Sequence, residues 1–343
     1  MFTRRRVLGY GAGIAAGLAL GRLSASPFPS LRASQVAPGA QLPPPETTTI
    51  RIAHFPCDAP IMAGERYLRQ EGFTNIQIVG PTTLASPARV DMAMYFSPID
   101  IAAGLQEGQR IVALAGLHPG CAEIWAQPGI GSLRDLRGRT IVVRSKTLSD
   151  PYAYIAVVLR HAGIDPTRDV NFVVQPDANP LNLYLEGKND AVYVASAGAA
   201  ALRANPANRG HVVHDMMMDD PWAKLDCCIL VTAQDWYRAH PVAAKRAVRA
   251  IFRAADFQPP DRADAVQLVT DRGLFGGPNN FNNVRTAANM VPSNWREIDL
   301  ERSTRFFGQL LTDVGLLRVS VDDMVRVLDL RILRELRAEL KMS

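Results

Sequence analysis

Strand and helix patterns alternate along residues 49–215, and this alternation restricts the possible folds more than any other feature of the chain. Short runs of alternating or continuous apolar residues are each followed by a segment with helical spacing. The unit occurs over residues 49–120 and again over residues 138–215, and residues 236–257 begin a largely helical final third. Repeated βαβ units predict an α/β protein. We therefore expect two lobes bridged by strands, each a mostly parallel sheet flanked by helices.

The first 48 residues differ in composition from the rest. Residues 1–32 combine a basic start with a run rich in Gly and Ala, and residues 3–8, TRRRVL, resemble the twin-arginine export motif. This pattern is typical of a secretory signal peptide. The apolar run has about 15 residues, fewer than the 20 or so that span a membrane. We expect twin-arginine export to the periplasm, with an uncleaved membrane anchor as the alternative, and a flexible Pro-rich linker over residues 33–48.

The basic charge of the chain is confined to its N-terminus. The formal net charge is +5, and residues 1–32 carry five arginines and no acidic residue, so the remainder has no net charge. Nucleic-acid binding requires a basic surface, so we expect no nucleic-acid partner. The sequence contains no P-loop, no HExxH motif and no nucleophile elbow, and it assigns no catalytic residue.

Several motifs follow one another in the order of a known family. Val90-Asp91, IVALAGLH at 111–118 and SLRDLRG at 132–138 are followed by HAGIDP and by LYLEGKNDA. Together these residues resemble the nitrate/sulfonate/taurine-type solute-binding proteins of ABC transporters. The resemblance implies a type II periplasmic binding fold that closes on a small solute. It also implies a monomer without enzymatic activity, whose partner is a membrane permease driven by a cytoplasmic ATPase.

The resemblance also divides the chain. Residues 49–125 form the first part of lobe one, residues 126–228 form lobe two, and residues 229–343 return to lobe one and add the C-terminal helices. The segments CAEIWAQ, beginning at Cys121, and CCILVTA, beginning at Cys227, are then the two crossing strands of the hinge.

Residues that follow the expected strands are the candidate ligand-binding residues. Ligands of α/β proteins collect at the carboxyl ends of strands, and helix N-termini there bind anions. We expect a small anionic or heteroaromatic solute, such as a sulfonate, nitrate or a pyrimidine. Each candidate also has a structural interpretation, as a core aromatic, a solvated lysine or a loop anchor. The candidates are His54, Phe55, Cys57, Tyr95, Phe96, Ser97, His118, Cys121, Ser145, Lys146, Thr147, Tyr193, Ser196, Trp222 and Cys227.

The chain has four cysteines, two of them adjacent. Export implies an oxidising compartment, in which disulfides persist. Since adjacent residues of a strand point to opposite sides, Cys227 and Cys228 cannot both face one partner. Given the hinge implied by the resemblance, we expect either a disulfide of Cys121 with Cys227 or Cys228, or buried thiols near Cys57 at the floor of the cleft. No Cys-x-x-Cys or His-x-x-x-His spacing is present, so the sequence assigns no metal ligand and no cofactor.

Two other functions are compatible with the same fold. One is a pyrimidine-synthase-like enzyme of thiamine-precursor biosynthesis, although such enzymes carry a dense, iron-associated run of cysteines and only two are adjacent here. The other is an anchored periplasmic sensor. Ligand-induced closure without turnover distinguishes a solute receptor from the enzyme, and an uncleaved N-terminus indicates the sensor.

Overall fold

The structure is a computed structural model, and it describes residues 42–55, 57, 61, 64–80, 84, 90–95, 97–257, 261–290 and 295–340. The expected signal peptide, the alternative membrane anchor and most of the expected linker lie outside the described residues. Within the described part of the chain, no helix combines the length and the apolar character needed to cross a membrane.

The first lobe is built on a five-stranded sheet. Its strands are β1 (Thr49–Ala53), β2 (Asn75–Val79), β3 (Met92–Tyr95), β4 (Ile111–His118) and β10 (Cys228–Ala233). They lie in the order β2-β1-β3-β10-β4, with β1 parallel to β2 and β3. β10 is antiparallel to both of its neighbours, β3 and β4, and it is the strand that returns from the second lobe.

The second lobe is built differently, on a three-stranded sheet and a separate two-stranded sheet. Its strands are β5 (Ala122–Ala126), β6 (Thr140–Val143), β7 (Asn171–Val174), β8 (Ala191–Ala195) and β9 (His211–Asp215). β6 and β7 pair in parallel, whereas β5 runs antiparallel between β8 and β9. The expectation of one mostly parallel sheet in each lobe is therefore wrong for the second lobe, where both pairings of the three-stranded sheet, in the order β8-β5-β9, are antiparallel and only β6 and β7 pair in parallel. In both lobes the antiparallel pairings involve the strand along which the chain enters that lobe, β5 or β10.

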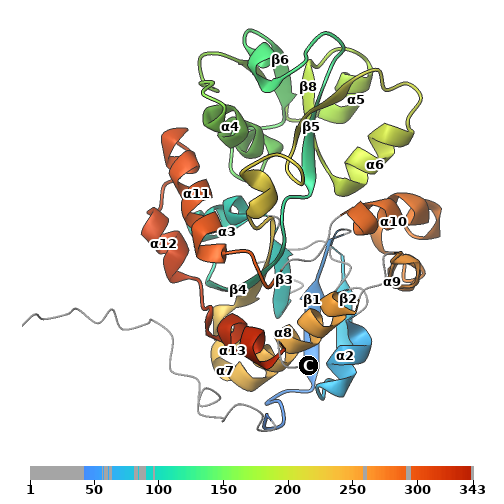
Figure 1. The fold of residues 1–343 in the computed structure, drawn as a ribbon, viewed down its shortest axis with the longest axis vertical. Coiled ribbons are helices and arrows are strands. Elements are labelled where there is room, and N and C mark those ends of the chain that lie inside the picture. Colours follow the sequence, from blue (N-terminus) through green and yellow to red (C-terminus); the bar gives the residue numbers. More distant parts are fainter. Residues whose placement is uncertain are drawn as a thin grey trace, which may run out of the picture.

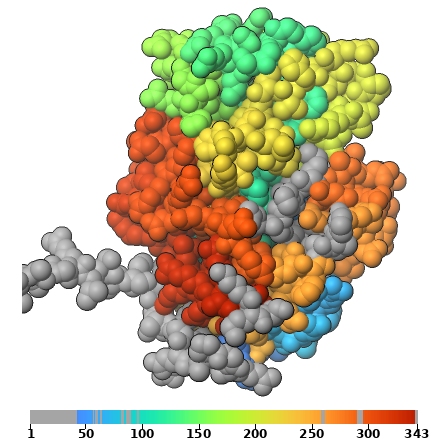
Figure 2. All heavy atoms as spheres, viewed as in Figure 1, coloured from blue at the N-terminus to red at the C-terminus, as the bar shows by residue number. Residues whose placement is uncertain are grey.

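Helices surround both lobes, and the expected helical final third is confirmed. The helices are α2 (Glu65–Gln70), α3 (Pro98–Gln106), α4 (Pro151–His161), α5 (Pro180–Leu185), α6 (Ser196–Ala204), α7 (Gln234–Ala239), α8 (Pro241–Asp256), α9 (Ala263–Thr270), α10 (Phe281–Met290), α11 (Leu300–Asp313), α12 (Val321–Arg326) and α13 (Arg331–Glu339). α11 packs against α3 and α4, and α10 packs against α6 of the second lobe. In Figures 1 and 2 the green and yellow second lobe forms one end of the molecule, and the blue, orange and red segments form the other.

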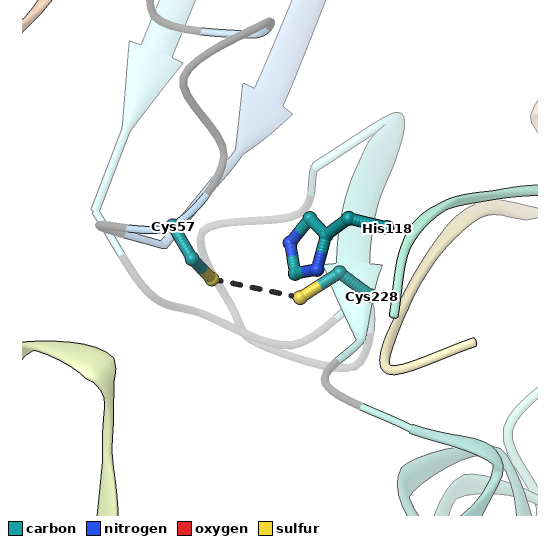
Figure 3. Close-up of side chains that lie close together, drawn as sticks. All are labelled: Cys57, His118 and Cys228. Carbon is teal, nitrogen blue, oxygen red and sulfur yellow. Dashed lines mark hydrogen bonds between the residues drawn. The ribbon is translucent and has the colours of Figure 1, made fainter. Parts of the chain in front are cut away.

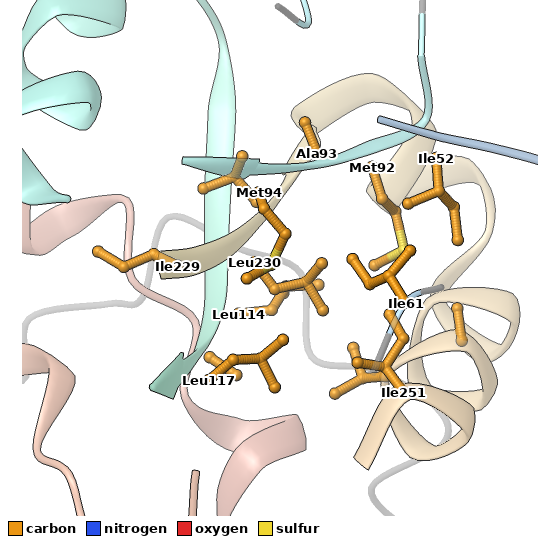
Figure 4. Close-up of a cluster of buried hydrophobic side chains, with 14 of the residues drawn as sticks. Ile52, Ile61, Met92, Ala93, Met94, Leu114, Leu117, Ile229, Leu230 and Ile251 are labelled. Atoms are coloured by element: carbon orange, nitrogen blue, oxygen red, sulfur yellow. The ribbon is translucent and has the colours of Figure 1, made fainter. Parts of the chain in front are cut away.

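The core of the first lobe lies between the sheet and α8. Apolar residues recur along α8 at helical spacing, so one face of this helix is continuously buried. Ile251 of α8 lies over the sheet together with Ile52, Met92 and Leu230 of three neighbouring strands (Figure 4). Burying an aliphatic side chain of this size stabilises the fold by about 1.5–3 kcal/mol relative to exposure. This packed layer fixes the carboxyl ends of the strands, from which the site is built.

The two crossings between the lobes lie against each other. Because β5 pairs with β8 and β9, the first crossing falls at residues 119–121, a few residues before the boundary expected at 125. The second crossing runs from the end of β9 to β10. An added Cβ on Gly116 would lie 1.6 Å from the Oδ1 atom of Asp226, so only glycine permits this approach.

The last residues of the expected linker are fixed to the first lobe. The guanidinium of Arg246 donates to the carbonyl oxygens of Leu42 and Pro43 at 2.7 and 2.9 Å. The carboxylate of Glu46 accepts hydrogen bonds from the backbone N–H groups of Val242 and Ala243, at the start of α8. Such N–H groups have no partner within their own helix, and a carboxylate there is favourable. Residues 42–46 are therefore part of the folded lobe, and any flexible tether lies before them.

Candidate functional site

A pocket of about 420 Å³ lies in the second lobe, at the carboxyl ends of β6 and β8. Ala195, the last residue of β8, pairs with Ala122, the first residue after the crossing, so this end of β8 lies at the hinge. Val142, Val192 and Val194 supply apolar wall, and Tyr193, whose ring centre lies 5.0 Å from that of Tyr154, also lines the pocket. A cavity of this size suits a small molecule.

The pocket offers two features that attract an anion. α6 starts at its wall, and no described side chain caps this helix, so its first N–H groups remain available to a ligand. α4, which also starts there, is instead capped by Asp150, whose carboxylate accepts from the N–H of Tyr152 at 3.0 Å. Arg144 follows β6 and lines the same wall, 3.7 Å from the Asp150 carboxylate. The lining also contains the carboxylates of Asp150 and Asp177, so the features that attract an anion are confined to the start of α6 and Arg144.

A second cluster lies at the carboxyl edge of the first-lobe sheet. We call it the cysteine centre, and it consists of Cys57, His118, Cys121, Cys227 and Cys228. Every member is at most 2% exposed, and all four cysteines carry thiols rather than disulfides. The Sγ atoms of Cys57 and Cys228 are 3.5 Å apart, and those of Cys121 and Cys227 are 3.2 Å apart. Figure 3 shows Cys57, His118 and Cys228 converging from separate segments.

Long-range strand pairing positions the cysteine centre. His118 ends β4 and pairs with Cys228, the first residue of β10, and the N–H of Cys227 donates to the carbonyl of His118 at 3.0 Å. The register shifts immediately after Cys228. Such irregularities re-aim side chains, and both Cys227 and Cys228 lie within 4.8 Å of Cys121. The expectation that strand alternation separates the two cysteines therefore fails, because Cys227 precedes the regular strand.

Burial suppresses charge near this edge of the sheet. His54 is completely buried, and desolvation lowers the pKa of its imidazole to about 4. Its ring meets the ring of Phe275 edge-on at 4.8 Å. Burial also raises the pKa of the Asp100 carboxyl to about 7, although this carboxyl accepts from the N–H of Ser97. Both groups are therefore largely or partly neutral near pH 7.

The structure divides the candidate residues into two groups. Cys57, His118, Cys121 and Cys227 come together in the cysteine centre, whereas Tyr193 lines the pocket. Ser196 is the first residue of α6, and Ser145, Lys146 and Thr147 follow Arg144 at the end of β6. Lys146 and Thr147 are exposed, and the Nζ atom of Lys146 lies 6.0 Å from the centre of the Phe172 ring.

The remaining candidates belong to neither group or lie outside the described residues. Ser97 caps α3, accepting from the N–H of Ile99 at 3.1 Å. Trp222 is 2% exposed and meets the rings of Phe306 and Phe307 of α11, so it packs in the core. Phe55 is half-buried beside the first-lobe core. The side chain of Tyr95 and all of Phe96 lie outside the described residues.

Sequence reasoning missed three features of the pocket and the cysteine centre. Arg144 directly follows a strand, so the rule that led to Ser145 applied equally to Arg144. The start of α6 at the pocket had a weaker signal, because Ala195 is simply not a capping residue. Cys228 was considered as a disulfide partner or a buried thiol, yet it belongs to both groups of convergent donor atoms in the cysteine centre.

Comparisons with known proteins give a family and a fold. The model of the NMT1/THI5-like family matches residues 77–263, which is more than half of the chain. No curated protein matches the sequence closely enough to serve as a relative.

Three solved structures illustrate the fold. The periplasmic nitrate-binding protein NrtA from Synechocystis PCC 6803 is 14% identical, with 88% of this chain and 91% of that chain covered and a TM-score of 0.64. The periplasmic aliphatic sulphonate-binding protein SsuA from Escherichia coli is 14% identical, with coverage of 82% and 92% and a TM-score of 0.64. The desulfurization enzyme DSZB is 14% identical, with coverage of 85% and 99% and a TM-score of 0.54. The expected periplasmic binding fold is confirmed, and this fold also serves an enzyme.

Proposed function

Because this chain belongs to the NMT1/THI5-like family, we propose that it is the periplasmic solute-binding component of an ABC importer. The observation that carries the proposal is the pocket at the carboxyl ends of β6 and β8, next to the hinge of a two-lobed fold. Ligands of α/β proteins bind at such strand ends, and hinged lobes close around them. The pocket is the half-site of the second lobe, and closure brings the first lobe over it.

The solute is small and carries an anionic group, as a sulfonate or nitrate does, or a heteroaromatic ring. The start of α6 and Arg144 receive the anion, and the three valines with Tyr193 contact the remainder. Ser145 and Thr147, which follow Arg144, and Ser196, the first residue of α6, are the hydroxyl groups next to these two features in the chain. Nitrate and sulphonate are bound by two proteins of the same fold, which is consistent with this chemistry.

Transport follows from closure. The solute binds the closed conformer more tightly than the open one, and it therefore shifts the population toward the closed conformer. The closed protein docks on a membrane permease, whose cytoplasmic ATPase drives import. Export through the twin-arginine pathway delivers the monomeric receptor to the periplasm.

A thermal-shift screen of the exported protein tests this proposal. We expect one compound among sulfonates, nitrate, aromatic acids and pyrimidines to raise the melting temperature by several degrees, because a ligand at 100 times its Kd adds about 2.7 kcal/mol. Mass spectrometry should recover the compound unchanged. No shift with any compound would contradict the receptor proposal, and conversion of the bound compound would favour the enzyme alternative.

A matched pair of variants locates the site. Arg144→Ala should weaken binding of an anionic solute at least about tenfold, which is 1.4 kcal/mol, because it removes the positive side chain at the pocket wall. Arg168→Ala is the control, since Arg168 is exposed in the same lobe, does not line the pocket, and contacts the carboxylate of its neighbour Asp169 at 3.0 Å. Equal affinities of the two variants would exclude Arg144 from the site.

A further inference from the structure

We propose that the cysteine centre binds a thiophilic d¹⁰ metal ion, Zn²⁺ or Cu⁺, through Cys57, His118 and Cys228. Cys121 and Cys227 supply further thiolate within reach of Cys228. None of these residues lines the solute pocket, and the inference does not depend on the proposed transport function.

The distances between the donor atoms are close to those between the ligands of a single metal ion. Cys57, His118 and Cys228 each offer one donor atom, and these three atoms lie within 4.8 Å of one another. The same limit holds for Cys121, Cys227 and Cys228. Two thiolates bound to one tetrahedral zinc, each at 2.3 Å, are about 3.8 Å apart. The observed Sγ separations of 3.5 and 3.2 Å are close to this value, so a small movement brings the sulfur atoms into a coordination shell.

The tautomer of His118 is set for coordination. Its Nδ1 atom lies 2.6 Å from the carbonyl oxygen of Pro119. A carbonyl can only accept, so Nδ1 carries the proton and Nε2 presents its lone pair. Metal-binding histidines are held in this way by a hydrogen bond from their other ring nitrogen to a carbonyl or carboxylate. The His118 ring also lies next to Cys57 and Cys228 in Figure 3.

The surroundings favour a coordinated ion over apolar packing. Buried thiols pack well as small apolar groups, but that interpretation does not account for an imidazole that is 1% exposed among them. A bound d¹⁰ cation accepts the lone pair of the imidazole and compensates the charge of buried thiolates. Thiolate and imidazole donors together select Zn²⁺ or Cu⁺ over Mg²⁺ or Ca²⁺.

The site could not be predicted from the sequence, because its ligands are far apart in the chain. Cys57 and Cys228 are separated by 171 positions, and Cys121 and Cys227 by 106. Short-range ligand spacings are therefore absent, although strand pairing brings the donors together.

The test uses the exported full chain, purified anaerobically without added metal and kept reduced, and loaded separately with Zn²⁺ or Cu⁺. After desalting, elemental analysis is expected to find one ion per chain in the sample loaded with Zn²⁺, in the sample loaded with Cu⁺, or in both. Competition with a chromophoric chelator measures the affinity and identifies the preferred ion. Substitution with Co²⁺ should give a sulfur-to-metal charge-transfer band in the near ultraviolet.

Variants assign the ligands. Cys228→Ser should abolish retention of the ion. Val231→Ala is the control, because Val231 is also buried in β10 but carries no donor atom, and this variant should retain the ion. His118→Gln keeps all four thiols and should weaken binding at least about tenfold. Circular dichroism checks that each variant is folded, and the charge-transfer band of His118→Gln gives a second readout if Cys228→Ser does not fold.

Three results would overturn the proposal. The first is a folded, reduced protein that retains neither ion. The second is equal retention by wild type, Cys228→Ser and His118→Gln. The third is two disulfides, Cys57 with Cys228 and Cys121 with Cys227, in the exported protein before any reductant is added.

Discussion

Gly120→Ala is expected to lower the free energy of unfolding by about 3 kcal/mol, at the upper end of the cost of overpacking a core. A Cβ at this buried position would lie 2.1 Å from the Cβ of Met216 and 2.7 Å from its carbonyl oxygen. Neither atom belongs to a flexible side-chain end, so the two crossing segments must separate. Urea unfolding followed by circular dichroism measures the change.

Gly131→Ala is the matched control. The nearest atom to a Cβ at Gly131 is a side-chain oxygen of Asp135 at 3.7 Å, which is ordinary contact. The control should therefore change stability by no more than about 0.5 kcal/mol. If the two variants unfolded at the same urea concentration, the close contact between the crossings would be wrong.

The second large effect concerns pH. His54 has a folded-state pKa of about 4, lowered mainly by burial from its ordinary value of 6.5. Between these values the unfolded chain binds more protons at this residue than the folded chain does. The contribution of neutral His54 to stability is therefore fully present above pH 6.5 and is lost as the pH falls toward 4. Between pH 7 and pH 5 the loss is about 2 kcal/mol.

The comparison with His54→Leu isolates this contribution. Burial raises the pKa values of Asp100 and Asp226 to about 7, so these carboxyls stabilise the fold as the pH falls and oppose the effect of His54. Leucine fills the site without titrating. The difference in unfolding free energy between wild type and His54→Leu should shift by about 2 kcal/mol in favour of the variant from pH 7 to pH 5. A pH-independent difference would show that His54 is not held neutral by burial.

The sequence predicted the elements well, because their signals are local. Alternation in residues 49–53 and the apolar face of residues 241–256 depend on neighbours a few positions away, and β1 and α8 form there. The Pro-rich segment was less predictable. Pro43 and Glu46 belong to a composition typical of linkers, yet contacts with α8 fix them to the first lobe.

The candidate site was only partly predictable, because it depends on which distant segments meet. Strand ends pointed to Tyr193 and to His118, and both lie in the clusters described above. The position of a residue at a strand end does not predict that Trp222 packs under α11. Nor does it predict the register shift after Cys228, which brings both adjacent cysteines toward Cys121. Hydrophobic periodicity indicates that a residue is buried. The residues that it contacts depend on how all the strands of the sheet pair.

Closure of the two lobes on a solute is the central claim, and small-angle X-ray scattering tests it most directly. The exported protein is measured alone and with a saturating concentration of the compound that gives the largest thermal shift. The account predicts a smaller radius of gyration with the compound, because the lobes approach each other across the gap. Scattering curves that superimpose, with a compound that calorimetry shows to be bound, would contradict it.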